Sequence, residues 1–129
     1  MAKRDVTVRV GGAAGDGVAT VGEIFARVCS RSGLHVFTYS AYQSVIRGGH
    51  VWIQVRAGEE KVLSQGDRVD ALVALNSETF THHGREVAPD AVVIHDQARV
   101  KAGPESLARG ARDLPMPLAR LSGPALTLA

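Results

Sequence analysis

Apolar and polar residues alternate near the start of the chain. Val6, Val8 and Val10 are separated by Thr7 and Arg9, and a glycine-rich run follows at once. A period of two is typical of a β-strand, because successive side chains point to opposite faces of a sheet. Glycine clusters mark turns. The pattern therefore predicts a first strand that ends in a glycine-rich turn.

A helical period replaces the alternation from Val18 to about Arg31. Apolar side chains recur there at the spacing of one helix face, and they are Val21, Ile24, Phe25, Val28 and Cys29. Ser32 and Gly33 follow, and glycine readily takes the left-handed conformation that closes a helix. We expect a helix over this segment with its apolar stripe, including Cys29, buried.

The next part of the chain predicts two strands joined by a loop. Residues 35–39 are expected to form a second strand, and the polar residues 40–49, which end in two glycines, a loop. Residues 50–56 predict a third strand. The short run 61–64 is expected to pair with it across the turn at Gly58.

Two nearly continuous apolar runs come next. Residues 70–75 and 91–95 have the composition of strands buried on both faces. Between them, Ser77 is expected to cap a short helix through Gly84. After Arg99, prolines and glycines leave room only for short elements. This order of elements predicts an α/β fold, a Rossmann-like layered domain with a mixed, mostly parallel sheet.

Composition narrows the class of protein. The 129 residues are 45% hydrophobic and 22% charged, which is ordinary for one globular domain. A formal charge of +2 gives no reason to expect nucleic acid or a membrane surface as a partner. The single cysteine, Cys29, excludes an internal disulfide and an iron–sulfur cluster held by this chain alone. With no apolar run long enough for a membrane span and no signal peptide, we expect a cytoplasmic protein.

The glycine-rich turn at residues 11–17 has two interpretations. Between a strand and a helix, its backbone N–H groups can hold a phosphate, and it approximates the dinucleotide-binding fingerprint. An NAD site also needs an acidic residue at the end of the second strand. Residues 38–40 are Thr, Tyr and Ser, which argues against NAD. A tight turn without a ligand remains the alternative.

Gly15-Asp16-Gly17 also resembles the start of a thiamine diphosphate motif. Such motifs close with a pair of asparagines that complete the coordination of magnesium. The only asparagine in this chain is Asn76. We therefore do not expect this chain's own motif to hold thiamine diphosphate.

Two segments are more specific together than either is alone: GGAAGDGVATVGE at residues 11–23 and YSAYQSVIRGGHVWIQVR at residues 39–56. Together they resemble the gamma domain of the pyruvate, 2-oxoglutarate and related 2-oxoacid:ferredoxin oxidoreductases. The family has a glycine-rich turn, then a loop ending in Arg-Gly-Gly or Ser-Gly-Gly, then a strand ending in Arg. Residues 70–76 are similar to its D-x-L-V-A-L-N strand. The resemblance covers residues 5–98 in the same order.

The resemblance implies one part of an enzyme that converts a 2-oxoacid to an acyl-coenzyme A. Thiamine diphosphate, magnesium and iron–sulfur clusters are then expected on alpha and beta subunits or domains, with ferredoxin as the electron acceptor. This chain is expected to hold none of these cofactors by itself and to be inactive alone. Its expected role is to assist the binding of coenzyme A, a co-substrate, and to take part in assembly of the complex.

Matching the family motif residue by residue places coenzyme A contacts in two groups. They are Gly15, Asp16 and Gly17 in the turn and Ser44, Arg47, Gly48 and Gly49 in the loop. A helix N-terminus and a planar guanidinium suit phosphates. Two departures stand out. Val45 and Ile46 replace lysines that some members carry, and the chain ends at Ala129. We therefore expect one gamma-type domain over residues 1–129, a fragment or a reduced form without the C-terminal helices.

Other residues have competing interpretations. His82 and His83 are expected to be packing or solvent-facing histidines and not metal ligands. Trp52 is either a second-layer core residue or an interface anchor, and Arg47 either an anion contact or part of a subunit-interface ion pair. No catalytic constellation is evident. A stand-alone Rossmann-like nucleotide-binding module and a purely structural subunit remain the alternative functions.

Overall fold

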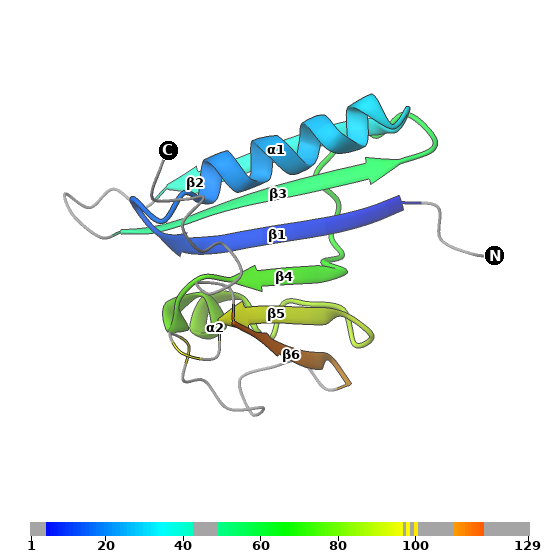
Figure 1. Cartoon of the computed structure of the whole chain (residues 1–129). Helices are drawn as coiled ribbons and strands as arrows, with labels where there is room; N and C mark the ends of the chain where they lie inside the picture. The colour runs from blue at the N-terminus through cyan, green and yellow to red at the C-terminus, as the bar shows by residue number, and fades with distance from the viewer. Residues whose placement is uncertain (1–4, 43–48, 97, 99, 101–109, 118–129) are drawn as a thin grey trace.

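A computed structural model describes residues 5–42, 49–96, 98, 100 and 110–117 (Figure 1). Their elements, in order, are β1 (Asp5–Ala13), α1 (Val18–Arg31), β2 (His35–Tyr42), β3 (His50–Gly58), β4 (Ala71–Ala74), α2 (Ser77–His83), β5 (Val92–Asp96) and β6 (Arg112–Met116). The six strands form one sheet in the order β2-β3-β1-β4-β5-β6. This confirms the α/β class with a mixed, mostly parallel sheet.

One strand accounts for the mixed character of the sheet. β3 runs antiparallel to both β1 and β2, whereas β1, β4, β5 and β6 are mutually parallel. The helix α1 supplies the crossover that returns the chain from β1 to the parallel β2. β3 then lies between them, with Ala13 opposite His50 on one side and Tyr42 opposite Val51 on the other.

Helix α1 packs on one face of the sheet, over β2, β3 and β1 (Figure 1). The buried residues of this layer are Val10, Val18, Val51, Ile53 and Val55. The helix approaches closely at Gly22, where an added Cβ would lie 2.4 Å from Cγ2 of Ile53. A glycine in mid-helix therefore serves packing here and not flexibility.

The expected apolar stripe of α1 is only partly buried. Cys29 is buried as expected, together with Val18 and Gly22. Val21, Ile24 and Val28 are instead 43%, 57% and 57% exposed. The expectation that the whole stripe faces the core is therefore wrong. The small residues Gly22 and Ala26 lie closer to the sheet, and the branched residues are turned to the side.

Helix α2 packs on the opposite face. The second core cluster comprises Val69, Leu72, Ala74, Phe80, Val87, Ala88, Ala91, Val93 and Val100. The N-cap of α2 is Asn76, whose Oδ1 accepts a hydrogen bond from the N–H of Thr79 at 3.0 Å. Ser77 is therefore the first helical residue and not the cap. Asparagine caps as well as serine does, so the sequence alone did not distinguish the two.

Three further expectations need correction. Residues 61–64 form no strand, because β3 is already paired along its length with β1 and β2. The second strand extends to Tyr42, into the segment expected as a loop. β6 was not expected, since Pro115 lies within it. Among the described strands β6 pairs only with β5, and an edge strand tolerates proline.

Neither helix in the described part of the chain is long and apolar enough to cross a membrane.

Candidate functional site

The glycine-rich turn lies at the carboxyl end of β1 and leads directly into α1. The N–H of Asp16 donates to the carbonyl of Ala13 at 3.0 Å, and the Asp16 carboxylate accepts from the N–H of Ala13 at 2.9 Å. These reciprocal bonds close the turn. Ligands of open α/β sheets commonly bind at this edge, outside the carboxyl ends of the parallel strands.

Gly15 and Gly17 are required by their backbone conformation. Their φ angles are +97° and +83°, in the region that residues with a Cβ rarely adopt. Among the described residues, no atom would lie within 4 Å of a Cβ added at either position. No described residue therefore blocks the close approach to this backbone that a phosphate group needs.

The N-terminus of α1 adds a favourable electrostatic field. Its N-cap, Gly17, has no side chain to accept from the first N–H groups, and the first turn over residues 18–20 contains no acidic side chain. The helix dipole and these N–H groups attract a negative charge. The turn and the helix start thus form an anion-binding geometry.

The loop expected to complete the site reaches the turn through Gly49. The N–H of Ala14 donates to the carbonyl of Gly49 at 3.1 Å, so the turn and the start of β3 are directly joined. Gly49 is buried. Ser44, Arg47 and Gly48 lie outside the described residues. The structure therefore brings together Gly15, Asp16, Gly17 and Gly49 of the expected set.

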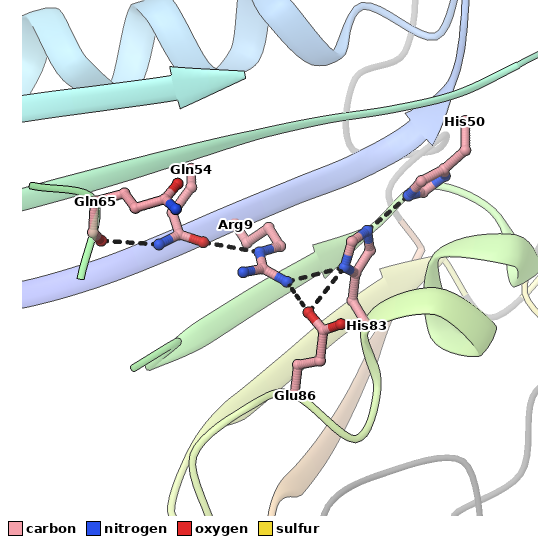
Figure 2. A network of polar contacts seen from close by, with 6 residues as sticks. All are labelled: Arg9, His50, Gln54, Gln65, His83 and Glu86. Atoms are coloured by element: carbon pink, nitrogen blue, oxygen red, sulfur yellow. Dashed lines mark hydrogen bonds and ion pairs between the residues drawn. The ribbon is translucent and has the colours of Figure 1, made fainter. Parts of the chain in front are cut away.

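A polar network lies beside Gly49, on the face of the sheet that carries α2. Figure 2 shows Arg9 of β1 at its centre, between Gln54 of β3 and His83 at the end of α2. Arg9 Nε donates to Gln54 Oε1 at 2.9 Å, and Nη1 contacts His83 Nδ1 at 2.9 Å and the carboxylate of Glu86. His83 Nε2 lies 2.7 Å from Nε2 of the buried His50.

The geometry assigns the protons of this network. A guanidinium can only donate, so Nδ1 of His83 accepts from Arg9 and the His83 proton lies on Nε2. Nε2 of His83 then donates to Nε2 of His50, which carries its own proton on Nδ1. Burial and the charge of Arg9 lower the pKa of His83 to about 4. Burial, with His82 nearby, also lowers the pKa of His50. Both rings are neutral near pH 7.

Aromatic contacts extend the network across β3. The guanidinium of Arg9 lies 4.5 Å from the ring centroid of Trp52, a cation–π contact. Trp52 also contacts the rings of Tyr39 and His83, each with a centroid distance of 5.5 Å. Trp52 points away from the side of its neighbour Ile53. It is half-buried and packs against these rings.

The histidines follow the packing interpretation. His83 is buried, and the ring of His82 stacks on that of His50 with centroids 4.7 Å apart. The sequence had not singled out Arg9 or His50. Arg9 did stand at an alternate position among the valines of β1, and His50 directly follows the glycines of the loop. Only the sheet register, which sets residues 9 and 54 opposite each other, brings the network together.

Two other candidate residues have structural roles. Asn76, the single asparagine, caps α2 with its side chain. Burial raises the pKa of the Cys29 thiol, which lies on the sheet side of α1. Within the described ranges, no group of three or more His, Cys, Asp or Glu side chains is arranged to hold a metal ion.

The strand order explains why the dinucleotide fingerprint is incomplete. In dinucleotide-binding folds the second strand lies beside the first, so its terminal acidic residue reaches the ribose. Here β3 separates β1 from β2. Residues 38–40 therefore lie one strand further from the glycine turn.

The sheet and its turn define a class of protein: an α/β domain with Rossmann-like layers and a glycine turn suited to an anion. The chain belongs to the pyruvate ferredoxin/flavodoxin oxidoreductase family, whose model matches residues 7–125. The resemblance to 2-oxoacid:ferredoxin oxidoreductases is thereby confirmed. The relatives of this chain are components of oxidoreductase complexes.

Individual relatives agree with this assignment. The alpha subunit of a 2-oxoacid:ferredoxin oxidoreductase from a Sulfolobus species is 29% identical over 89 residues, which are 69% of this chain and 14% of the relative. A solved 2-oxoglutarate:ferredoxin oxidoreductase from Magnetococcus marinus, with 2-oxoglutarate, coenzyme A and succinyl-CoA bound, matches with a TM-score of 0.83 and 30% identity. That match covers 94% of this chain and 21% of the other.

A separate gamma subunit has the same fold. The gamma subunit of a keto/oxoacid ferredoxin oxidoreductase from Geobacter sulfurreducens matches with a TM-score of 0.73, over 93% of this chain and 65% of that one. The identity is 21%, so this match shows the fold alone. The same fold therefore occurs both in a separate gamma subunit and as a small part of a longer chain.

Proposed function

We propose that this chain is the gamma component of a thiamine diphosphate-dependent 2-oxoacid:ferredoxin oxidoreductase. In that enzyme it assists coenzyme A binding and takes part in assembly of the complex. The observation that carries the proposal is the open turn at Gly15 and Gly17, which leads into a helix start without a side-chain cap. The Magnetococcus relative, solved with coenzyme A bound, supports the choice of ligand.

The chemistry of the turn suits the phosphates of coenzyme A. The N–H groups at the start of α1 donate to an anion, and Gly15 and Gly17 put no Cβ in its way. Gly49 contributes by joining the loop to the turn, and Ser44, Arg47 and Gly48 are proposed as contacts on the loop. The hydrogen bond from the N–H of Ala13 to Asp16 supports a role for that carboxylate in shaping the turn.

The remaining cofactors belong on partner chains. Asn76 caps α2, and the thiol of Cys29 is buried, so neither suits thiamine–magnesium or iron–sulfur binding. We propose that alpha and beta subunits, or domains of them, hold thiamine diphosphate, magnesium and the clusters, and pass electrons to ferredoxin. The bound thiamine would supply the decarboxylation chemistry.

The first experiment is affinity purification of this chain from its native cell, followed by mass spectrometry and an activity assay. The expected partners carry a complete thiamine diphosphate motif and cysteine clusters. The eluate should reduce a viologen dye only when a 2-oxoacid and coenzyme A are both present. A chain that elutes alone, without thiamine diphosphate or iron, would contradict the proposal.

Arg47 provides the test of the coenzyme A role. In the assembled complex, Arg47→Ala should raise the KM for coenzyme A by about 10-fold or more, because a charge-assisted hydrogen bond contributes roughly 1.5–3 kcal/mol. Steady-state kinetics with varied coenzyme A measure this. Lys61→Ala, which removes a positive charge from an exposed position after β3, serves as the control and should leave the KM unchanged.

The alternatives give different results. A purely structural subunit predicts that Arg47→Ala weakens assembly while the KM for coenzyme A stays the same. A stand-alone nucleotide-binding module predicts that NAD or ATP stabilises the isolated chain in a thermal-shift assay. The strand order argues against NAD, because β3 separates residues 38–40 from the glycine turn.

A further inference from the structure

An apolar row crosses the sheet on the side of α1 and becomes progressively uncovered. Ile53, Val10, Val73, Ile94 and Leu114 are in register across β3, β1, β4, β5 and β6. Under the helix, Ile53 and Val10 are 6% and 3% exposed. Val73 and Ile94 are only partly buried, and Leu114 is 43% exposed. The helix thus covers half of this row.

The exposed stripe of α1 faces the same uncovered half. Val21, Ile24 and Val28 are spaced three and four residues apart, so they form one ridge. In a right-handed crossover from β1 to β2, with Val18, Gly22 and Cys29 on the sheet, this ridge points toward β4 and away from β2. Figure 1 shows α1 over β2, β3 and β1, with no described helix in front of β4, β5 and β6.

The ridge points toward the side of the sheet on which the row is uncovered, and we call the two apolar surfaces together the docking face. It comprises Val21, Ile24, Val28, Val73, Ile94 and Leu114. Isolated exposed apolar residues are ordinary, but several that face the same side of the molecule mark an interaction surface. A ridge at helical spacing is suited to packing against another helix.

The rim of the docking face is basic. Arg27 and Arg31 are exposed and follow the ridge on the solvent side of α1. Arg112 is exposed on β6, two residues before Leu114 and therefore on the same side of the sheet. Two copies of this chain would bring basic rims together, which disfavours self-association. The charges favour a partner with acidic side chains beside an apolar ridge.

The relatives indicate where such a partner comes from. A similar domain is 14% of the Sulfolobus alpha subunit and 21% of the Magnetococcus chain, so in these proteins it is joined to a much larger body. We propose that the docking face binds an acidic-flanked apolar helix of the thiamine diphosphate-bearing subunits. This inference rests on the proposed function, since it names the face used for assembly.

The test measures affinity for the thiamine diphosphate-bearing subunits obtained in the purification above. Ile24→Glu and Leu114→Glu are expected to weaken binding by about 30-fold or more, the effect typical of a buried interface anchor. Leu63→Glu is the matched control, because Leu63 is 76% exposed but lies far along the chain from both elements. It should change the Kd less than about twofold.

Further measurements separate the outcomes. Arg27→Glu combined with Arg31→Glu should weaken binding and reduce its dependence on salt. Thermal melting of each free variant confirms that it is folded, and Ile24→Ser replaces Ile24→Glu if that variant does not fold. Normal binding by the Ile24 and Leu114 variants would contradict the docking face and leave the proposed function intact. If no thiamine-bearing partner is found, the inference fails together with the proposed function on which it rests. If the free chain dimerises through Ile24, the occupant of the docking face is a second copy and the inference is wrong.

Discussion

At the scale of single residues, Arg9 organises the polar interior on the α2 side of the sheet. It joins Gln54, His83 and Glu86 and lies over the ring of Trp52. Through His83 it also sets the proton position on His50, the residue after Gly49. Side chains from three elements are thereby held beside the segment proposed to meet coenzyme A.

The neutral state of His83 predicts a pH dependence of stability. Its pKa is lowered from an ordinary value near 6.5 to about 4, so the unfolded chain takes up the proton first as the pH falls. The contribution of His83 to the free energy of unfolding is therefore fully present above pH 6.5. It is lost as the pH falls toward 4, and the total loss is about 3 kcal/mol. The lowered pKa of His50 acts in the same direction.

Urea unfolding across this pH window provides the measurement. His83→Gln keeps hydrogen-bonding atoms but cannot titrate, so its free energy of unfolding should vary less between pH 6.5 and 4 than that of the wild type. His35→Gln removes an exposed histidine and should leave the wild-type slope intact. Equal slopes for His83→Gln and the wild type would show that His83 is not the group responsible.

At the scale of elements, α1 is shaped by two competing requirements. Helix propensity disfavours glycine at position 22 by about 1 kcal/mol relative to alanine. Packing demands it, because a Cβ there would be 2.4 Å from Cγ2 and 2.7 Å from Cδ1 of Ile53. The packing requirement prevails, and it leaves Val21, Ile24 and Val28 beside the sheet instead of on it.

Gly22→Ala is therefore expected to destabilise the chain despite its better helix propensity. Overpacking costs about 1–3 kcal/mol, which outweighs the gain. The midpoint of urea unfolding measures the difference, and Ser30→Ala, at an exposed position of the same helix, should be neutral or slightly stabilising. In an Ile53→Ala background the contacting atoms are absent. If Gly22→Ala still destabilises that background by the same amount, the clash is not the cause.

Helix α1 and strand β6 show which elements the local sequence can predict and which it cannot. The bounds of α1 agree with the expectation from its periodicity, because an amphipathic helix of this length has a strong local pattern. β6 was missed, since Pro115 opposes a strand in any local interpretation. Only its place at the edge of the described sheet makes that proline tolerable.

At the scale of the whole molecule, the sheet puts the carboxyl ends of β1, β4 and β5 at one edge, beside the glycine turn. The two helices lie on opposite faces and bury separate core clusters. The turn is suited to binding an anion, while Arg9, His83 and Glu86 are held in a polar network on the α2 side. This arrangement is consistent with the proposed accessory role.

The isolated chain is accordingly expected to have no 2-oxoacid-dependent dye reduction. Supplying thiamine diphosphate, magnesium and coenzyme A should not change this, because Asn76 and Cys29 have structural roles. Viologen reduction under anaerobic conditions measures it, with the purified complex as the positive control. Turnover by the isolated chain above background would contradict its assignment as an accessory component.

The sequence by itself determined the class of fold, the bounds of α1, the presence of β4 and β5 and the turn at Gly15-Asp16-Gly17. These features arise from interactions between residues close in the chain: periodicity, glycine conformation and capping. The expectation that β4 and β5 are buried on both faces was wrong, because Val73 and Ile94 are only partly buried. The tertiary structure alone decided that β3 lies between β1 and β2, that Arg9 meets His83, and which side of α1 is buried. Each depends on pairing between segments far apart in the chain, where register and close packing, and not local pattern, set the energy.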